Sequence, residues 1–274
     1  MKLRPYITLE KKLGETPLET MEAWRKREAP RYDSTPLAYA GRLDPMATGK
    51  LLVLIGDTCK VQTQYHSLDK CYEFSILVGI GSDTGDVLGR LTYPTTVTHP
   101  TKSAVKAALK KYTGSVTLPF PIFSAKTVKG KPLHTWAVEG RLAEITIPTQ
   151  TSTVYSLSIS KIETRMRARI YEEALKKINS IPPVTDERKA LGNDFRRVDV
   201  RADWLAWRNG GAPSDRFTII HLRCIASSGT YMRSLAEVIA KELGSTGLAY
   251  HIHRTHIGKY LPLIKNVGIW QKRY

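Results

Sequence analysis

Cysteine, acidic side chains and long apolar runs are all scarce in this sequence. The 274 residues include three cysteines, Cys59, Cys71 and Cys224, which are widely spaced and form no C-x-x-C pair. An odd, scattered set of cysteines indicates neither a disulfide framework nor a thiolate zinc site, and it is typical of a reducing compartment. No apolar run approaches the ~20 residues that span a bilayer, and the N-terminus lacks the apolar stretch of a secretory signal. We therefore expect a soluble cytoplasmic protein with no membrane partner.

The shortage of acidic residues leaves a large positive charge. Lys and Arg number 42 against 25 Asp and Glu, so the formal net charge is +17. A field of this sign attracts polyanions and disfavours acidic proteins as partners. The charge favours a nucleic-acid partner; a generally basic proteome or a place on the ribosome surface is the alternative interpretation.

Hydrophobic periodicity predicts strands and helices mixed along a chain of one large domain. Apolar runs and alternating patterns predict strands at residues 6–10, 50–56, 71–79, 152–160 and 216–226. Apolar stripes at a spacing of three or four predict helices at residues 17–29, 104–112, 161–180 and 231–244. Loops are expected at 35–49 and 114–141. Because strands and helices do not alternate regularly, an α+β fold is favoured over a doubly wound sheet.

Two local patterns suggest ligand sites that the sequence does not support. The glycine-rich stretch 79–85 resembles a dinucleotide fingerprint, but three residues instead of two separate its last glycines, so a flexible loop is the better interpretation. His251 and His253 would share one face of a strand and, with His256, could bind a metal. They lack a nearby Asp, Glu or Cys, so we expect protonatable histidines that face phosphates instead.

Asp44, Tyr72 and Arg233 each have an ordinary explanation when taken singly. Asp44 precedes Pro45 in a glycine-flanked loop and could simply form an Asx turn. Tyr72 begins an apolar strand face, as a core tyrosine would. Arg233 has Glu237 one helical turn away, which would form a surface ion pair. What changes the interpretation is the set of motifs in which these residues lie.

Five segments, in this order, resemble the motifs of the TruB-type RNA pseudouridine synthases. They are GRLDPMATGKLLVLIGDTCK at 41–60, DKCYEF at 69–74, GSDTGDVLG at 81–89, PIFSAKTVKGKPLHTWAVEG at 121–140 and SSGTYMRSLAEVIAKELG at 227–244. Five ordered motifs make the resemblance specific.

The resemblance implies one pseudouridine synthase catalytic domain over residues 1–274, with a mixed, mainly antiparallel central sheet flanked by helices and loops. It implies an isomerase that breaks the N-glycosidic bond of a flipped-out uridine and rejoins the uracil through C5, with no cofactor or metal. The family's usual target, the T-loop uridine of tRNA, is the expected substrate of a monomeric enzyme. The alternatives are a catalytically silent RNA-binding or ribosome-assembly protein on the same scaffold and, last, metal-dependent RNA hydrolysis through the histidines.

Three residues carry the implied chemistry. By resemblance, Asp44 is the nucleophile or the carboxylate that activates the ribose, and Arg233 is the arginine that pairs with it. A guanidinium fork beside a buried carboxylate favours the charged form and fixes its orientation. Tyr72 resembles the ring that stacks on the target base, and its hydroxyl is a candidate to take the C5 proton.

A second group of residues is expected to bind the substrate. Asp86 resembles the polar partner of the repositioned uracil edge, and Ile252 takes the place of an apolar pocket residue. Arg42, in the first motif, is expected to contact substrate as well. The segment 121–141 resembles an RNA-gripping insertion loop, whose expected contacts with phosphates and bases are Lys126, Lys129, Lys131 and His134.

The chain departs from the family pattern in three places. Tyr39 stands where the family usually has a histidine that helps hold the flipped nucleotide, and a tyrosine can still stack there. Residues 161–215, expected to be a helical insertion, replace what is normally a short hairpin. The chain stops at Tyr274, so we expect it to lack the RNA-binding PUA domain that many relatives append. These departures leave the RNA target open.

Overall fold

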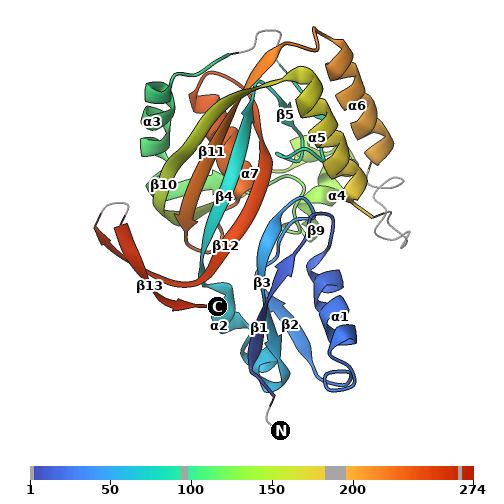
Figure 1. Ribbon diagram of the computed structural model, residues 1–274, viewed down its shortest axis with the longest axis vertical. Coiled ribbons are helices and arrows are strands. Elements are labelled where there is room, and N and C mark those ends of the chain that lie inside the picture. The colour runs from blue at the N-terminus through green and yellow to red at the C-terminus, as the bar shows by residue number, and fades with distance from the viewer. Residues whose placement is uncertain (1–2, 94–97, 183–195, 265–266) are drawn as a thin grey trace.

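A strongly curved β-sheet runs through the computed structural model of this protein (Figure 1). The structure describes residues 3–93, 98–182, 196–264 and 267–274. Within these ranges, nine strands form one sheet in the order β1-β3-β12-β4-β11-β10-β7, with β2 added to β3 and β13 added to β12. The strands are β1 (Tyr6–Lys11), β2 (Leu37–Ala40), β3 (Thr48–Ile55), β4 (Asp69–Val78), β7 (Gly114–Pro119), β10 (Thr149–Met166), β11 (Arg216–Ala226), β12 (Gly247–Ile264) and β13 (Val267–Arg273).

Strand pairing in this sheet is mainly antiparallel. β3 and β12 run parallel where His253 faces Thr48 and Arg254 faces Gly49. The other neighbours among the described strands pair antiparallel. The predicted α+β fold with a mixed, mainly antiparallel central sheet is therefore confirmed.

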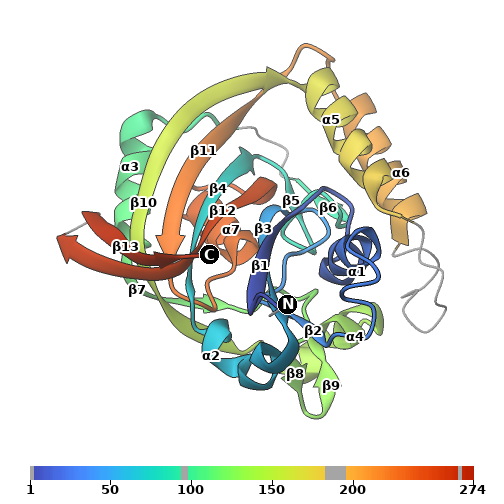
Figure 2. The ribbon, with the colours of Figure 1, turned by 60° about the horizontal axis from the view of Figure 1, so that its bottom comes forward.

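Helices cover the sheet, and two short hairpins extend from its loops. In Figure 1, α7 lies behind the sheet and α3 beside it, while α5 and α6 stand next to each other, as they do in Figure 2. None of the helices in the described ranges has the length and apolar character that crossing a membrane requires. The helices are α1 (Pro17–Arg27), α2 (Thr63–His66), α3 (Lys102–Lys111), α4 (Leu133–Val138), α5 (Arg167–Ser180), α6 (Arg197–Asn209) and α7 (Met232–Glu242), with the short 3-10 helices η1 (Gly56–Val61) and η2 (Leu142–Glu144). The hairpins are β5 (Gly81–Ser82) with β6 (Leu91–Thr92) and β8 (Thr127–Val128) with β9 (Lys131–Pro132).

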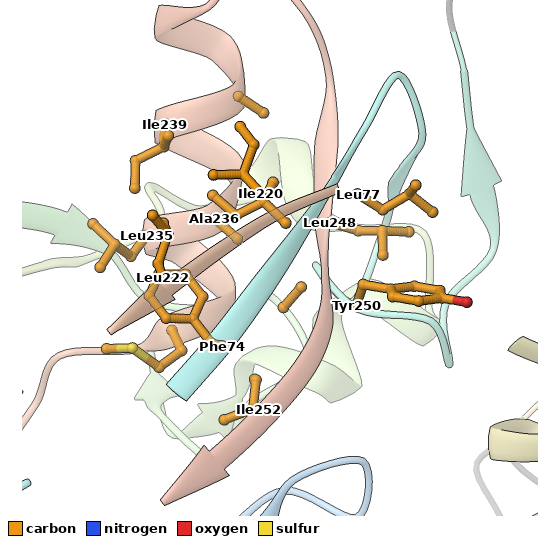
Figure 3. Close-up of a cluster of buried hydrophobic side chains, with 14 of the residues drawn as sticks. Phe74, Leu77, Ile220, Leu222, Leu235, Ala236, Ile239, Leu248, Tyr250 and Ile252 are labelled. Carbon is orange, nitrogen blue, oxygen red and sulfur yellow. The ribbon is translucent and has the colours of Figure 1, made fainter. Parts of the chain in front are cut away.

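The main core lies between α7 and the sheet. Leu235 and Ile239 of α7 belong to the same buried cluster as Phe74 of β4 and Leu222 of β11 (Figure 3). Burial of these large apolar side chains attaches the helix to the sheet with the apolar stripe that the sequence predicts. Because Arg233 lies in the first turn of α7, this packing decides where that side chain meets the strands.

The N-terminal strands form a smaller cluster with α1. The Thr16 hydroxyl accepts a hydrogen bond from Glu19 N at 3.1 Å, and the Glu19 carboxylate accepts one from Thr16 N at 2.7 Å. This is the predicted capping box. Met21 and Trp24 then pack against β1 and β3. The cluster supports β3, which follows directly on the loop that contains Asp44.

Three predicted element boundaries are wrong. The apolar spacing predicts a helix from residue 161, but residues 161–166 continue β10, and α5 begins only at Arg167. β11 offers backbone partners along this whole stretch, and their hydrogen bonds outweigh the helical spacing. The loops expected at 35–49 and 114–141 contain regular elements. Leu37–Ala40 pairs with β3, β7 at the start of the second loop pairs with β10, and α4 lies near its end.

The described helices of the 161–215 segment belong to the main core. Trp204 of α6 is fully buried, and its indole N–H donates to the Val87 carbonyl at 3.1 Å. Arg90 donates to both carboxylate oxygens of Asp203 at 2.6 and 3.1 Å. Removing the segment would therefore expose the core instead of trimming a separate unit.

Trp204→Ala should lower the free energy of unfolding by about 3–5 kcal/mol, the range for truncating a large buried aromatic side chain. Leu205 is its neighbour on the same helix and is 44% exposed, so Leu205→Ala should cost less than about 1 kcal/mol. Urea unfolding followed by circular dichroism measures both values. Equal stabilities of the two variants would show that α6 is not part of the core.

Candidate active site

Asp44 lies in the loop between β2 and β3. Gly41 enters this loop with a φ of +83°, a backbone conformation that favours glycine. The loop turns at Ala47, whose N–H donates to the Asp44 carbonyl at 2.9 Å. The Asp44 side chain remains 41% exposed and lines a cavity. The carboxylate is therefore accessible to a ligand.

Arg233 holds this carboxylate with two nitrogens of its guanidinium. Nε donates to Oδ2 of Asp44 at 2.8 Å, and Nη2 donates to Oδ1 at 3.2 Å. Nη1 donates to the Thr84 carbonyl at 2.7 Å, and the Arg233 side chain is only 6% exposed. The planar fork fixes the orientation of the carboxylate and supplies its counter-charge. This burial excludes the surface ion pair with Glu237 that the sequence alone allows.

Two further carboxylates lie near Arg233. Asp86 is buried, and its Oδ2 lies 3.8 Å from Arg233 Nε, while its Oδ1 accepts hydrogen bonds from within the 84–88 turn. Burial raises the pKa of Asp86, and the Arg233 charge opposes the shift. Burial also raises the pKa of Glu237 to about 7, again against the Arg233 charge. Three carboxyl groups thus lie near the guanidinium, and Asp44 is the one that binds it with two hydrogen bonds.

Two buried cations hold the backbone of the Asp44 loop. Arg254 is 1% exposed and donates to three carbonyls of the 41–50 segment at 2.8, 3.2 and 3.2 Å. Lys11 is fully buried and donates to the Ala47 carbonyl at 2.6 Å. These bonds stabilise the loop conformation and place positive charge close to Asp44 without occupying its carboxylate.

β4 brings Lys70 and Tyr72 to the cavity wall. Lys70 donates to the Leu68 carbonyl at 2.5 Å, and burial lowers the pKa of its ammonium to about 8. Tyr72 is half-buried and lies opposite Arg254 in the pairing of β4 with β12. Burial raises the pKa of the Tyr72 hydroxyl, and the Arg254 charge opposes the shift. At neutral pH, Tyr72 therefore keeps its phenolic proton.

These side chains surround a cavity of about 930 Å³. That volume lies within the range of pockets that enclose organic ligands. The wall contains the predicted residues Arg42, Asp44, Tyr72, Asp86, Lys126, His134, Arg233 and Ile252. The structure thus brings all three predicted catalytic residues to one cavity together with five of the predicted substrate-binding residues.

Tyr39 lies away from this cavity. Its partner across the β2–β3 pairing is Val53, which belongs to the cluster beneath α1. Tyr39 packs against that cluster and is not part of the cavity wall. Stacking of Tyr39 on a nucleotide in the cavity is therefore not supported by its position.

The three lysines of the 121–141 segment differ in their surroundings: one lines the cavity, and two bind nearby residues. Lys126 lines the cavity. Lys131 pairs with Glu139 at 2.7 Å, and Lys129 donates to the Glu144 carbonyl at 3.0 Å. Neither Lys129 nor Lys131 is part of the cavity wall. The hairpin and α4 thus place one of the three lysines at the site.

Several residues of the wall escaped the sequence analysis, among them Lys70, Arg196 and Arg254. Residues two apart on a strand share a face. Lys70 therefore lies on the same side of β4 as Tyr72, and Arg254 on the same side of β12 as Ile252, so strand periodicity could have found both. Arg196 lies outside the recognised motifs and carried no comparable signal.

The histidines of β12 do not form part of the site. Alternation along the strand turns His251 and His253 away from the cavity face, and their rings stack with centroids 6.3 Å apart. Desolvation and the neighbouring Lys177 charge lower the pKa of His251 to about 4. The lowered pKa disfavours the protonated form of His251 at neutral pH, and the expectation that these histidines face phosphates stays a prediction. Within the described ranges, no group of three or more His, Cys, Asp and Glu is arranged to hold a metal.

Comparison with known proteins identifies relatives of this chain. Residues 31–176, more than half of the chain, match the family model described as TruB family pseudouridylate synthase (N terminal domain). The chain is 26% identical over 256 residues to tRNA pseudouridine synthase 4 of Saccharomyces cerevisiae, covering 81% of this chain and 60% of that protein. It is 30% identical over 209 residues to tRNA pseudouridine synthase B of Caldicellulosiruptor saccharolyticus, covering 72% and 69% of the two chains.

A solved structure supports the same fold. A chain in the crystal structure of a Cbf5-Nop10-Gar1 complex superposes on 92% of this chain with a TM-score of 0.53 and 17% identity. The match covers 48% of that chain, and this protein spans 60% of the length of its yeast relative.

Lys70 should make the free energy of unfolding depend on pH. Its pKa is about 8 in the folded protein and 10.5 in an ordinary lysine. Between these values the unfolded state binds more protons, so the free energy of unfolding should rise with pH, by at most about 3 kcal/mol. Urea unfolding across this window should show a smaller rise for Lys70→Met than for wild type. Lys12→Met, at an exposed position, should behave like wild type, and an unchanged rise in Lys70→Met would contradict a buried ammonium.

Proposed function

We propose that this chain, which belongs to the TruB family of pseudouridylate synthases, isomerises a uridine within RNA to pseudouridine. The observation that carries the proposal is the Asp44–Arg233 fork, which presents an oriented carboxylate to a cavity beside Tyr72. The reaction needs a carboxylate, a fixed counter-cation, an aromatic surface for the detached base and a group that takes the C5 proton. Each requirement has a candidate in this cavity.

Asp44 acts on the uridine, and Arg233 orients it. With both carboxylate oxygens bound by one guanidinium, the direction in which Asp44 presents a lone pair to the substrate is restricted. The same geometry is compatible with attack of Asp44 on the base and with its action at the ribose. In both cases the N-glycosidic bond breaks and the uracil rejoins through C5.

Tyr72 and Arg254 act as a pair on the detached base. The raised pKa of the Tyr72 hydroxyl keeps the phenol neutral at neutral pH, which suits a ring that stacks on uracil. Taking the C5 proton would require the phenolate, and Arg254 is the neighbouring charge that favours it. We propose that Asp86, which is held within its turn and lines the cavity, bonds the edge of the turned base.

RNA is the proposed polymer, and the T-loop uridine of tRNA is the proposed target. The chain carries a net charge of +17, and the cavity wall includes the cations Arg42 and Lys126. Flipping a uridine out of folded RNA costs a few kcal/mol, which phosphate contacts of this kind help to offset. Both named relatives are tRNA pseudouridine synthases, which supports tRNA as the first substrate to test.

Asp44→Asn should abolish pseudouridine formation on unmodified tRNA transcripts, because an amide cannot serve as the nucleophile or the activating carboxylate. RNA affinity should change less than about tenfold, since no phosphate-binding cation is removed. Chemical mapping of pseudouridine and filter binding give the two readouts, and thermal melting controls for folding. Appreciable turnover by folded Asp44→Asn would falsify the assignment, and an inactive wild type would support a silent RNA-binding protein.

Arg233→Lys should lower the rate constant at saturating RNA by at least about tenfold although the charge is kept. Lysine cannot donate to both oxygens of Asp44 and to the Thr84 carbonyl in one plane, so the carboxylate loses its orientation. Single-turnover kinetics measure the effect. Lys241→Arg on the exposed part of the same helix is the matched control, and a rate equal to wild type in Arg233→Lys would contradict the proposed orienting role.

A further inference from the structure

The 161–215 segment contributes one wall of the active-site cavity. Ile178 at the end of α5 and Val200 in α6 line the cavity with their apolar side chains, and Arg196 adds a cation directly before α6. We infer that Arg196 positions the substrate by binding a phosphate of the RNA chain next to the uridine that enters the cavity. This inference rests on the proposed function, because it assigns a contact of the same RNA.

Arg196 is held in place by its backbone and by the helix that follows it. It adopts a left-handed conformation, with a φ of 59°, at the N-terminal end of α6. α6 is anchored in turn by the buried Trp204 and by the Arg90–Asp203 ion pair. The Arg196 side chain therefore extends from the end of a helix that packs into the main core.

The Arg196 guanidinium joins the wall to the catalytic ion pair. It lies over the Phe123 ring, with 4.3 Å from its central carbon to the ring centroid. The carbonyl of the same Phe123 lies 3.4 Å from Nη2 and 3.5 Å from Nη1 of Arg233. One residue thus contacts both arginines, and Phe123 links the Arg196 part of the cavity wall to the arginine that orients Asp44.

The geometry favours a phosphate over a base as the ligand of Arg196. Phe123 covers one face of the guanidinium, so the N–H groups at its edge are what a ligand can reach. Two of the five donors bind Asp83, at 2.5 and 3.2 Å. The Asp83 and Arg196 side chains are 32% and 22% exposed, so solvent and a ligand can reach both partners of this ion pair. A phosphate presents the same paired oxygens as a carboxylate and can share or replace Asp83.

Three other cations of the wall donate to backbone carbonyls. Arg254 and Lys70 donate to carbonyls of the Asp44 loop and of the 66–68 turn, and Arg197 donates to the Ile181 carbonyl. Arg196 differs from these cations because its partner is a carboxylate whose side chain is 32% exposed. It is therefore the cation of the insertion best placed to change partner when RNA binds.

Arg196→Gln should weaken binding of unmodified tRNA transcript by about tenfold, as expected for a lost hydrogen bond to a charged group. The log–log salt slope should fall by roughly 0.7–0.9. The RNA concentration for half-saturation should rise, while the single-turnover rate at saturating RNA changes less than about threefold, and Arg196→Lys should restore part of the affinity. Arg208→Gln removes the same charge from the exposed far end of α6 and should stay within about twofold of wild type.

Asp83→Asn separates a phosphate contact from a structural ion pair. Asn keeps the side-chain oxygen that accepts from Arg90 N at 2.9 Å but releases the Arg196 charge. If Arg196 binds phosphate, this variant should bind RNA as tightly as wild type or more tightly. Weakening equal to that of Arg196→Gln would overturn the inference, and so would equal losses in Arg196→Gln and Arg208→Gln.

The binding assay also keeps this inference distinct from the proposed reaction. Wild-type protein that binds the transcript but forms no pseudouridine would refute the reaction, while the comparison of Arg196, Arg208 and Asp83 variants would still decide the phosphate contact. An active wild type with unchanged affinity in Arg196→Gln would refute the contact alone.

Discussion

A guanidinium withdrawn from water needs an opposite charge and acceptors for its N–H groups, and Arg233 finds them only where distant parts of the chain converge. Its partners are the Asp44 carboxylate and the carbonyls of Thr84 and Phe123, from loops that follow β2, β5 and β7. Asp86 lies nearby as a second carboxylate. The core between α7 and the sheet holds the first turn of α7 against these loops. Because the order of the strands brings the loops together, it also decides the geometry of the site.

The loop that carries Asp44 is shaped by cations that do not touch its carboxylate. Arg254 and Lys11 donate to loop carbonyls from β12 and β1. Burial makes the charged form of Lys11 costly and lowers its pKa to about 8. The buried ammonium fixes the loop through its hydrogen bond to the Ala47 carbonyl, and it creates a positive potential beneath the cavity. The net charge of the protein thus has a buried part that organises the site as well as an exposed part that attracts polyanions.

The described helices of the 161–215 segment pack into the main core, so this segment is an integral part of the domain. Its first residues lengthen β10, and its helix α6 buries Trp204 in the main core. Ile178 of α5 and Val200 of α6 line the cavity. A segment without a recognised motif therefore contributes to the main core and to the cavity wall together. The wall that it forms is built into the same core that holds α7, and with it Arg233, against the sheet.

What the sequence by itself determined is what a few neighbouring residues can specify: the Thr16 capping box, the strand β4, the stripe of α7, and the motifs that single out Asp44 and Arg233. Only the tertiary structure decided that β10 continues through Met166, that Tyr39 faces another cluster, and that Arg254 braces the Asp44 loop. The physical reason is the distance along the chain over which each effect acts. Propensity and periodicity act over a few residues, whereas desolvation and ion pairing depend on neighbours such as Asp44 and Arg233, which are 189 residues apart.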